Sequence, residues 1–106
     1  MDKRISRVVR RFVDRASQQQ TGIISAFVFG SYAKNMQHTD SDIDVALVID
    51  NLADTDRFDK QVRLMLLASQ IDSRIEPHPI SKSDLISDNP FMVEILRTGI
   101  ELKLES

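Results

Sequence analysis

Two aspartates near the middle of the chain have the residue type and spacing of a metal site. Asp42 and Asp44 stand two apart at the start of an apolar segment that predicts a strand over residues 42–49. Residues two apart on a strand point to the same face, so the two carboxylates are expected to lie side by side. Like charges this close are unfavourable unless a cation lies between them, and oxygen ligands favour Mg²⁺ or Mn²⁺. Because Mg²⁺ completes its shell with water and substrate phosphates, the pair predicts a phosphorylated ligand.

A phosphate-binding turn is predicted upstream of this pair, where Gly30 and Ser31 end the apolar segment at residues 23–29. Glycine lets the backbone approach a phosphate closely, and Ser31 adds a hydroxyl. The short helical turn predicted from Ser31 to Lys34 offers free N–H donors. Two interpretations of Lys34 are open: it reaches a terminal phosphate, or it is an ordinary surface lysine. If the two strands are antiparallel neighbours, the turn lies beside the two aspartates.

A third carboxylate, Glu76, interrupts an apolar strand predicted over residues 74–80. A lone buried carboxylate is costly, so it needs a partner or a cation. If this strand pairs with the one that begins at Asp42, Glu76 completes a triad with the aspartates, as a metal ligand and as the general base for an acceptor hydroxyl. The alternative is an exposed glutamate on an edge strand. The histidines, His38 and His78, lack metal-ligand spacing and are expected to have surface or packing roles.

The order of the predicted helices and strands favours the α/β (α+β) class, with a small mixed β-sheet and helices packed against it, as one domain over residues 1–106. Hydrophobic periodicity predicts helices at 3–19 and 56–71, and strands at 23–29, 42–49, 74–80 and 100–104. A cap pair at Ser81 and Asp84 and a proline at residue 90 predict two short helices at 83–87 and 90–98. The helix at 56–71 serves as the crossover to the third strand. Met65, Leu66 and Leu67 of this helix are expected in the core, and Tyr32 is expected to be partly buried.

The composition is that of a globular protein with two surfaces of opposite charge. The chain has 106 residues, 42% of them hydrophobic, and no cysteine, which excludes a disulfide-stapled secreted scaffold. No signal peptide or run of about 18 apolar residues is present, so a cytoplasmic protein without a membrane segment is expected. Residues 1–35 carry a net charge of +5 and the other 71 carry −7, and such a split suggests different partners for the two surfaces.

Gly30-Ser31, the Asp42-x-Asp44 pair and a third acid on a later strand together resemble the nucleotidyltransferase fold of the DNA polymerase β superfamily. The resemblance covers the whole chain. At this length the chain looks like the minimal nucleotidyltransferases, the MntA-type antitoxins encoded beside HEPN toxins.

The resemblance implies transfer of AMP from ATP to a hydroxyl, such as that of a tyrosine, on a partner HEPN toxin. Two Mg²⁺ ions would be held by Asp42, Asp44 and Glu76. The triphosphate would be held by the turn, with the residues Gly30, Ser31 and Lys34.

The chain departs from the family pattern at two positions. Asn35 stands where the family usually has Gly, and Asn tolerates the left-handed backbone well. Glu76 stands where the third acid is usually Asp, and its extra methylene moves the carboxylate by about 1.5 Å. An alternative function is therefore an antitoxin with a weak or inactive site that neutralises its partner by binding alone. Nucleic-acid binding through the basic first helix ranks last, because that helix has no interleaved aromatic residues.

Overall fold

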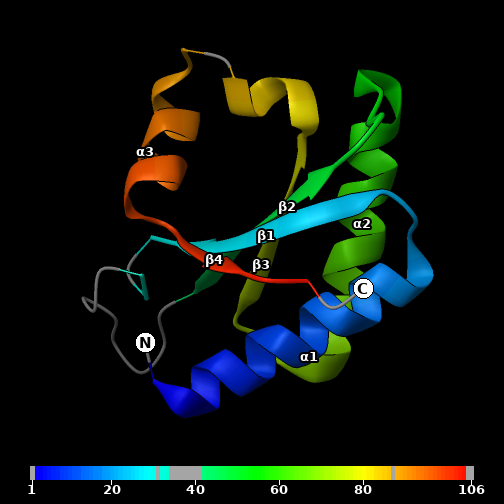
Figure 1. Cartoon of the computed structure of the whole chain (residues 1–106). Coiled ribbons are helices and arrows are strands. Elements are labelled where there is room, and N and C mark those ends of the chain that lie inside the picture. The colour runs from blue at the N-terminus through cyan, green and yellow to red at the C-terminus, as the bar shows by residue number, and fades with distance from the viewer. Residues whose placement is uncertain (1, 31, 34–41, 87, 105–106) are drawn as a thin grey trace.

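The computed structural model describes residues 2–30, 32–33, 42–86 and 88–104, which form a four-stranded sheet with helices on both faces (Figure 1). The elements follow in the order α1 (Lys3–Gln19), β1 (Ile23–Phe29), β2 (Ile43–Ile49), α2 (Asp54–Ile71), β3 (Ile75–Ser81), the 3-10 helix η1 (Lys82–Ile86), α3 (Pro90–Thr98) and β4 (Ile100–Leu102). Every helix and strand predicted within this part of the chain is present. Their ends differ from the predicted ones by at most two residues.

The sheet is mixed, as predicted, with the strand order β3-β2-β1-β4. β1 runs antiparallel to both β2 and β4, whereas β2 and β3 are parallel. A parallel pair needs a long crossover, and α2 supplies it. β3 contains Pro77 and Pro79, which cannot donate to a ladder, and its edge position accommodates them. The first two strands therefore occupy the centre, with the candidate residues at their facing ends.

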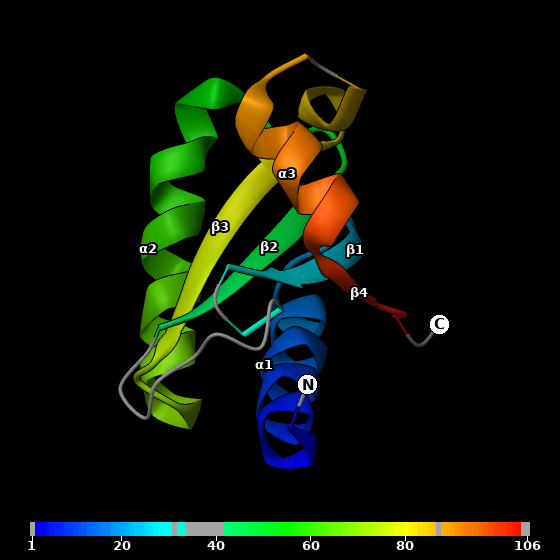
Figure 2. The same cartoon turned by 90° about the vertical axis from the view of Figure 1, so that its left-hand side faces the viewer.

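Each face of the sheet buries its own apolar cluster, which explains why β1 and β2 are almost continuously hydrophobic. On one face α1 and α2 pack against side chains that include Val45 and Leu47. On the other face α3 covers Phe29, Ala46 and Val48. Figure 2 shows α2 and α3 on opposite sides of the strands.

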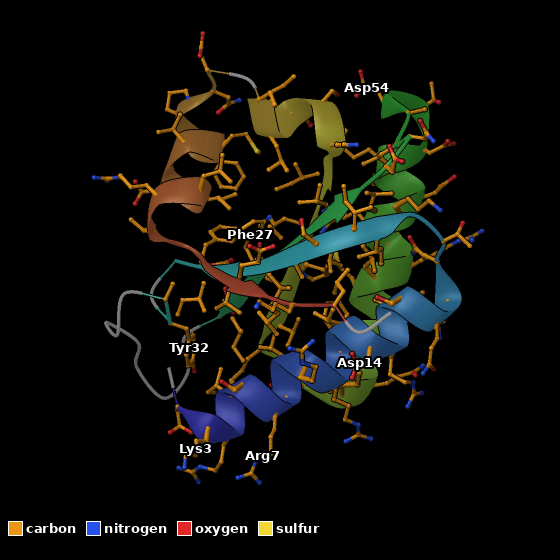
Figure 3. The ribbon with its side chains drawn as sticks, viewed as in Figure 1. Lys3, Arg7, Asp14, Phe27, Tyr32 and Asp54 are labelled. Atoms are coloured by element: carbon orange, nitrogen blue, oxygen red, sulfur yellow. The ribbon has the colours of Figure 1, made fainter. Side chains whose placement is uncertain are left out.

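The first helix follows its predicted amphipathic pattern. Asp2 caps its N-terminus by accepting a hydrogen bond from the Arg4 backbone N–H at 2.7 Å. The stripe that faces the sheet is buried and consists of Ile5, Val9, Phe12, Val13 and Ala16. Most of the basic side chains lie on the exposed side, and Figure 3 shows Lys3 and Arg7 pointing away from the sheet.

The prediction that Met65, Leu66 and Leu67 of α2 lie in the core is wrong for two of the three residues. Leu67 is buried, but Met65 and Leu66 are 50% and 62% exposed. The helix has two apolar sets of helical period, and the sheet contacts the one made of Leu64, Leu67 and Ala68. The outward set is Phe58, Val62, Met65 and Leu66. Hydropathy could not choose between two faces that are both apolar.

No helix in the described part of the chain combines the length and the hydropathy that crossing a membrane would require.

Candidate active site

The candidate site is built at the end of the sheet where β1 finishes and β2 begins. The antiparallel register pairs Asp44 of β2 with Phe29, the last residue of β1, and the parallel register pairs Asp44 with Glu76 of β3. Asp44 therefore lies between the end of one neighbouring strand and the acid of the other. Its side chain is 25% exposed, and that of Glu76 is 48% exposed, so solvent and a substrate can reach both carboxylates. Glu76 is thus an exposed glutamate on an edge strand and not the buried carboxylate expected, although its strand pairs with β2 as the triad requires.

Gly30 follows β1 in a backbone conformation that favours glycine. Its φ is +76°, and a Cβ atom built there would lie 2.5 Å from Oδ2 of Asp44. Real Cβ atoms do not approach a carboxylate oxygen this closely. The glycine is thus needed both for the turn and for the space that the Asp44 carboxylate occupies.

His78 lies beside the carboxylates of Asp44 and Glu76. The sequence did not lead us to expect this histidine in the site. Its Nε2 lies 3.2 Å from Oδ1 of Asp44 and 4.0 Å from Oε1 of Glu76. One ligand atom from each of the three residues lies within 4.8 Å of the other two. The signal was present in the sequence, because Glu76 and His78 stand two apart on one strand and must point to the same face.

Aromatic packing holds the His78 ring, in line with the packing role expected for it. The ring centroid lies 5.1 Å from that of Phe29 and 6.3 Å from that of Phe91, and the two phenylalanines meet edge to face at 5.4 Å. Aromatic rings favour such tilted and edge-to-face contacts at these distances. The imidazole is therefore held in place on the sheet with Nε2 toward the carboxylates.

A cavity of about 320 Å³ adjoins the three-residue cluster on the side of α3. Its lining includes His78 and Phe91, together with Arg57 and Gln61 of α2 and Asp84 of η1. Arg57 donates to Asp84 at 3.0 Å. Burial alone would raise the pKa of Asp84, but hydrogen bonds from Ser81 and Arg57 outweigh it, and the pKa lies below its ordinary value. The cavity thus carries a fixed ion pair in its wall.

A second network ties the segment after Gly30 to the turn that precedes Glu76. Tyr32 is buried more completely than the partial burial expected, and its hydroxyl oxygen accepts a hydrogen bond from Nη1 of Arg74 at 3.3 Å. Arg74 in turn donates through Nε and Nη2 to the two carboxylate oxygens of Asp72 at 3.0 and 2.7 Å. The hydrogen bond from Arg74 lowers the pKa of Asp72. This network fixes the spacing between the two halves of the site.

The remaining predicted site residues are placed as follows. Asp42 precedes β2 by one residue and is exposed, and its carboxylate is not one of the three clustered donors. Ser31, Lys34, Asn35 and His38 lie outside the described residues. Their proposed or expected roles stay predictions.

The comparisons with known proteins identify the family. The family described as Polymerase beta, Nucleotidyltransferase matches residues 13–106. The chain belongs to this family. No curated protein matches it.

Solved structures share the fold of this nucleotidyltransferase at low sequence identity. A protein from Sulfolobus solfataricus assigned as a nucleotidyltransferase is 15% identical, with a TM-score of 0.66 over 92% of this chain and 78% of that one. A toxin–antitoxin structure with AMP-PNP is 20% identical, with a TM-score of 0.61 over 91% and 74%. A variant of the MntA-HpeT toxin–antitoxin is 18% identical, with a TM-score of 0.60 over the same shares.

The donor set of this nucleotidyltransferase fits a divalent cation. Asp44 and Glu76 offer carboxylate oxygens, and His78 offers a ring nitrogen, all on one sheet face. No lysine or arginine within the described ranges forms an ion pair with Asp44 or Glu76.

Proposed function

We propose that this nucleotidyltransferase transfers AMP from ATP to a hydroxyl of a partner HEPN toxin, with tyrosine as the first candidate acceptor, and so acts as an antitoxin. The observation that carries the proposal is the close approach of Gly30 to Asp44, with Glu76 in register on the next strand. The turn that begins at Gly30 thus adjoins the carboxylates of the candidate metal site. The toxin–antitoxin neighbours, one of them with AMP-PNP, support the choice of nucleotide and partner.

In this reaction the acceptor oxygen attacks the α-phosphorus of ATP, and the bond from that phosphorus to the bridging oxygen breaks to release pyrophosphate. Two Mg²⁺ ions would neutralise the charge that develops on the phosphate oxygens. Asp42, Asp44 and Glu76 would hold the metals, and Glu76 would also take the proton of the acceptor hydroxyl.

Gly30 and Ser31 would place the triphosphate against the carboxylates, and Lys34 would reach its terminal phosphate. Tyr32 and Arg74 keep the turn and β3 in fixed relation. The protein's contribution is mainly positioning, because the phosphate, the acceptor and the carboxylates must meet within a few tenths of an ångström.

The test is a transfer assay with α-labelled ATP, Mg²⁺ and the protein encoded beside this chain. Wild type should label that protein, and Asp44→Asn should remove the label. Asp59→Asn is the matched control, because it makes the same chemical change at an exposed site on α2. Absence of transfer by wild type with every nucleotide tried would contradict the proposal. Full neutralisation of the partner by Asp44→Asn would instead support an antitoxin that acts by binding alone.

A further inference from the structure

We propose that His78 coordinates the divalent cation of the site through Nε2, together with Asp44 and Glu76, and that this nitrogen ligand makes the site prefer Mn²⁺ to Mg²⁺. The inference rests on the metal site of the proposed function and deepens it. It assigns a ligand outside the predicted carboxylate set and a choice of metal.

The distances between the donors already approach those of a coordination shell. In an octahedral shell with metal–ligand distances of about 2.1 Å, neighbouring ligand atoms are about 3.0 Å apart and opposite ones about 4.2 Å. Nε2 of His78 lies 3.2 Å from the Asp44 oxygen and 4.0 Å from the Glu76 oxygen. All three donors lie within 4.8 Å of one another. Shifts of a few tenths of an ångström would therefore place them around one ion.

The ring of His78 needs no reorientation to act as a ligand. Phe29 and Phe91 hold it, and the β3 backbone fixes its side of the sheet. Its side chain is 29% exposed, so little freedom would be lost when the nitrogen binds. The ion would replace the hydrogen bond that now joins His78 to Asp44.

The charges around the cluster also call for a cation. The arginine in the lining of the adjoining cavity, Arg57, already pairs with Asp54 and Asp84. An imidazole carries at most one positive charge and cannot balance two carboxylates, whereas a divalent ion bound by all three residues can.

The ligand type decides the metal. Mg²⁺ is a hard ion that demands oxygen ligands, so an imidazole in its shell is unfavourable. Transition metals accept imidazole nitrogen, and Mn²⁺ combines that tolerance with affinity for carboxylates and phosphates. A site of two carboxylates and one imidazole therefore binds Mn²⁺ in preference to Mg²⁺. An oxygen donor at residue 78 would raise the affinity for Mg²⁺ relative to that for Mn²⁺.

The experiment measures metal binding directly by electron paramagnetic resonance of Mn²⁺ added to the full chain. Wild type should show ¹⁴N modulation of the electron spin echo, and labelling the histidines with ¹⁵N should change it. The modulation should vanish in His78→Gln and His78→Asp and persist in His38→Gln, which alters the other of the two histidines. Circular dichroism confirms that each variant folds.

The choice of metal gives a second readout that a merely structural role would not move. The ratio of the Mg²⁺ to the Mn²⁺ dissociation constant should fall by about tenfold in His78→Asp, because an oxygen donor replaces nitrogen. A purely structural effect would weaken the binding of both metals equally and leave the ratio of the two dissociation constants unchanged. Bound Mn²⁺ without nitrogen modulation in wild type would overturn this inference, yet AMP transfer in the same preparation would leave the proposed function standing.

Discussion

Gly30 and Asp44 lie so close together that a Cβ atom at residue 30 would stand 2.5 Å from Oδ2 of Asp44. Any side chain at residue 30 would therefore clash with the Asp44 carboxylate, and only glycine leaves room for it. Because the two residues come from neighbouring antiparallel strands, a change at one acts directly on the other.

Gly30→Ala should therefore damage the site more than the fold. Alanine at a positive φ costs about 1 kcal/mol of stability, and the new methyl group must displace the Asp44 carboxylate. A displacement of about 1 Å is expected to lower the rate of transfer by roughly 100-fold. Transfer kinetics and the free energy of unfolding in urea measure the two effects.

Gly22→Ala is the matched control for this change. Gly22 also has a positive φ, of +92°, but a Cβ atom there meets the backbone oxygen of Asp50 at 3.2 Å. It should lose a similar amount of stability and keep its transfer activity. Equal activity losses in the two variants would show that backbone strain, not the Asp44 contact, governs the site.

Glu76→Gln should lower kcat by about 100-fold or more, because the amide cannot take the proton of the acceptor hydroxyl. Glu101→Gln makes the same change at an exposed position of β4 and should leave kcat unaltered. Single-turnover transfer measures both variants. A Glu76→Gln enzyme with the wild-type rate would remove Glu76 from the mechanism.

Asp72→Asn should destabilise the fold by about 1 kcal/mol at pH 7, since the charge-assisted bonds from Arg74 weaken and Arg74 is partly exposed. The pKa of Asp72 is lowered in the folded state, so its contribution is complete above the ordinary value of about 3.9. That contribution is lost as the pH falls through the folded pKa. Urea unfolding of both proteins at pH 7 and pH 3 should show the difference shrinking at the lower pH.

Two neighbouring leucines of α2 test which face of the helix packs on the sheet. Leu64 is 1% exposed and Leu66 is 62% exposed. Leu64→Ala should cost about 2–5 kcal/mol of stability through the cavity it leaves, whereas Leu66→Ala should cost less than about 0.5 kcal/mol. The midpoint of urea unfolding reports both. Similar losses would mean that the outward face is buried in solution, for example against a second molecule.

The sequence by itself determined the elements and the local parts of the site. Alternating or continuous hydrophobicity predicted the strands to within two residues of their observed ends. This succeeds because the pattern of buried and exposed residues in a strand is visible in its own sequence. Gly30 and Asp44 stood out by their residue types and by their places at strand ends, and Glu76 stood out as a carboxylate that interrupts an apolar strand. The resemblance carried by Gly30-Ser31 and the aspartate pair agrees with the family match over residues 13–106.

Only the tertiary structure decided which of these residues meet. The parallel register of β2 and β3 brings His78 to Asp44, although 34 positions separate them in the chain. Packing of α2 on the sheet also decides that Leu64 is buried and Leu66 is exposed. Both leucines lie on apolar faces of the helix, so the sequence alone could not distinguish them. Periodicity reports which residues share a face, whereas strand order and register determine what that face contacts.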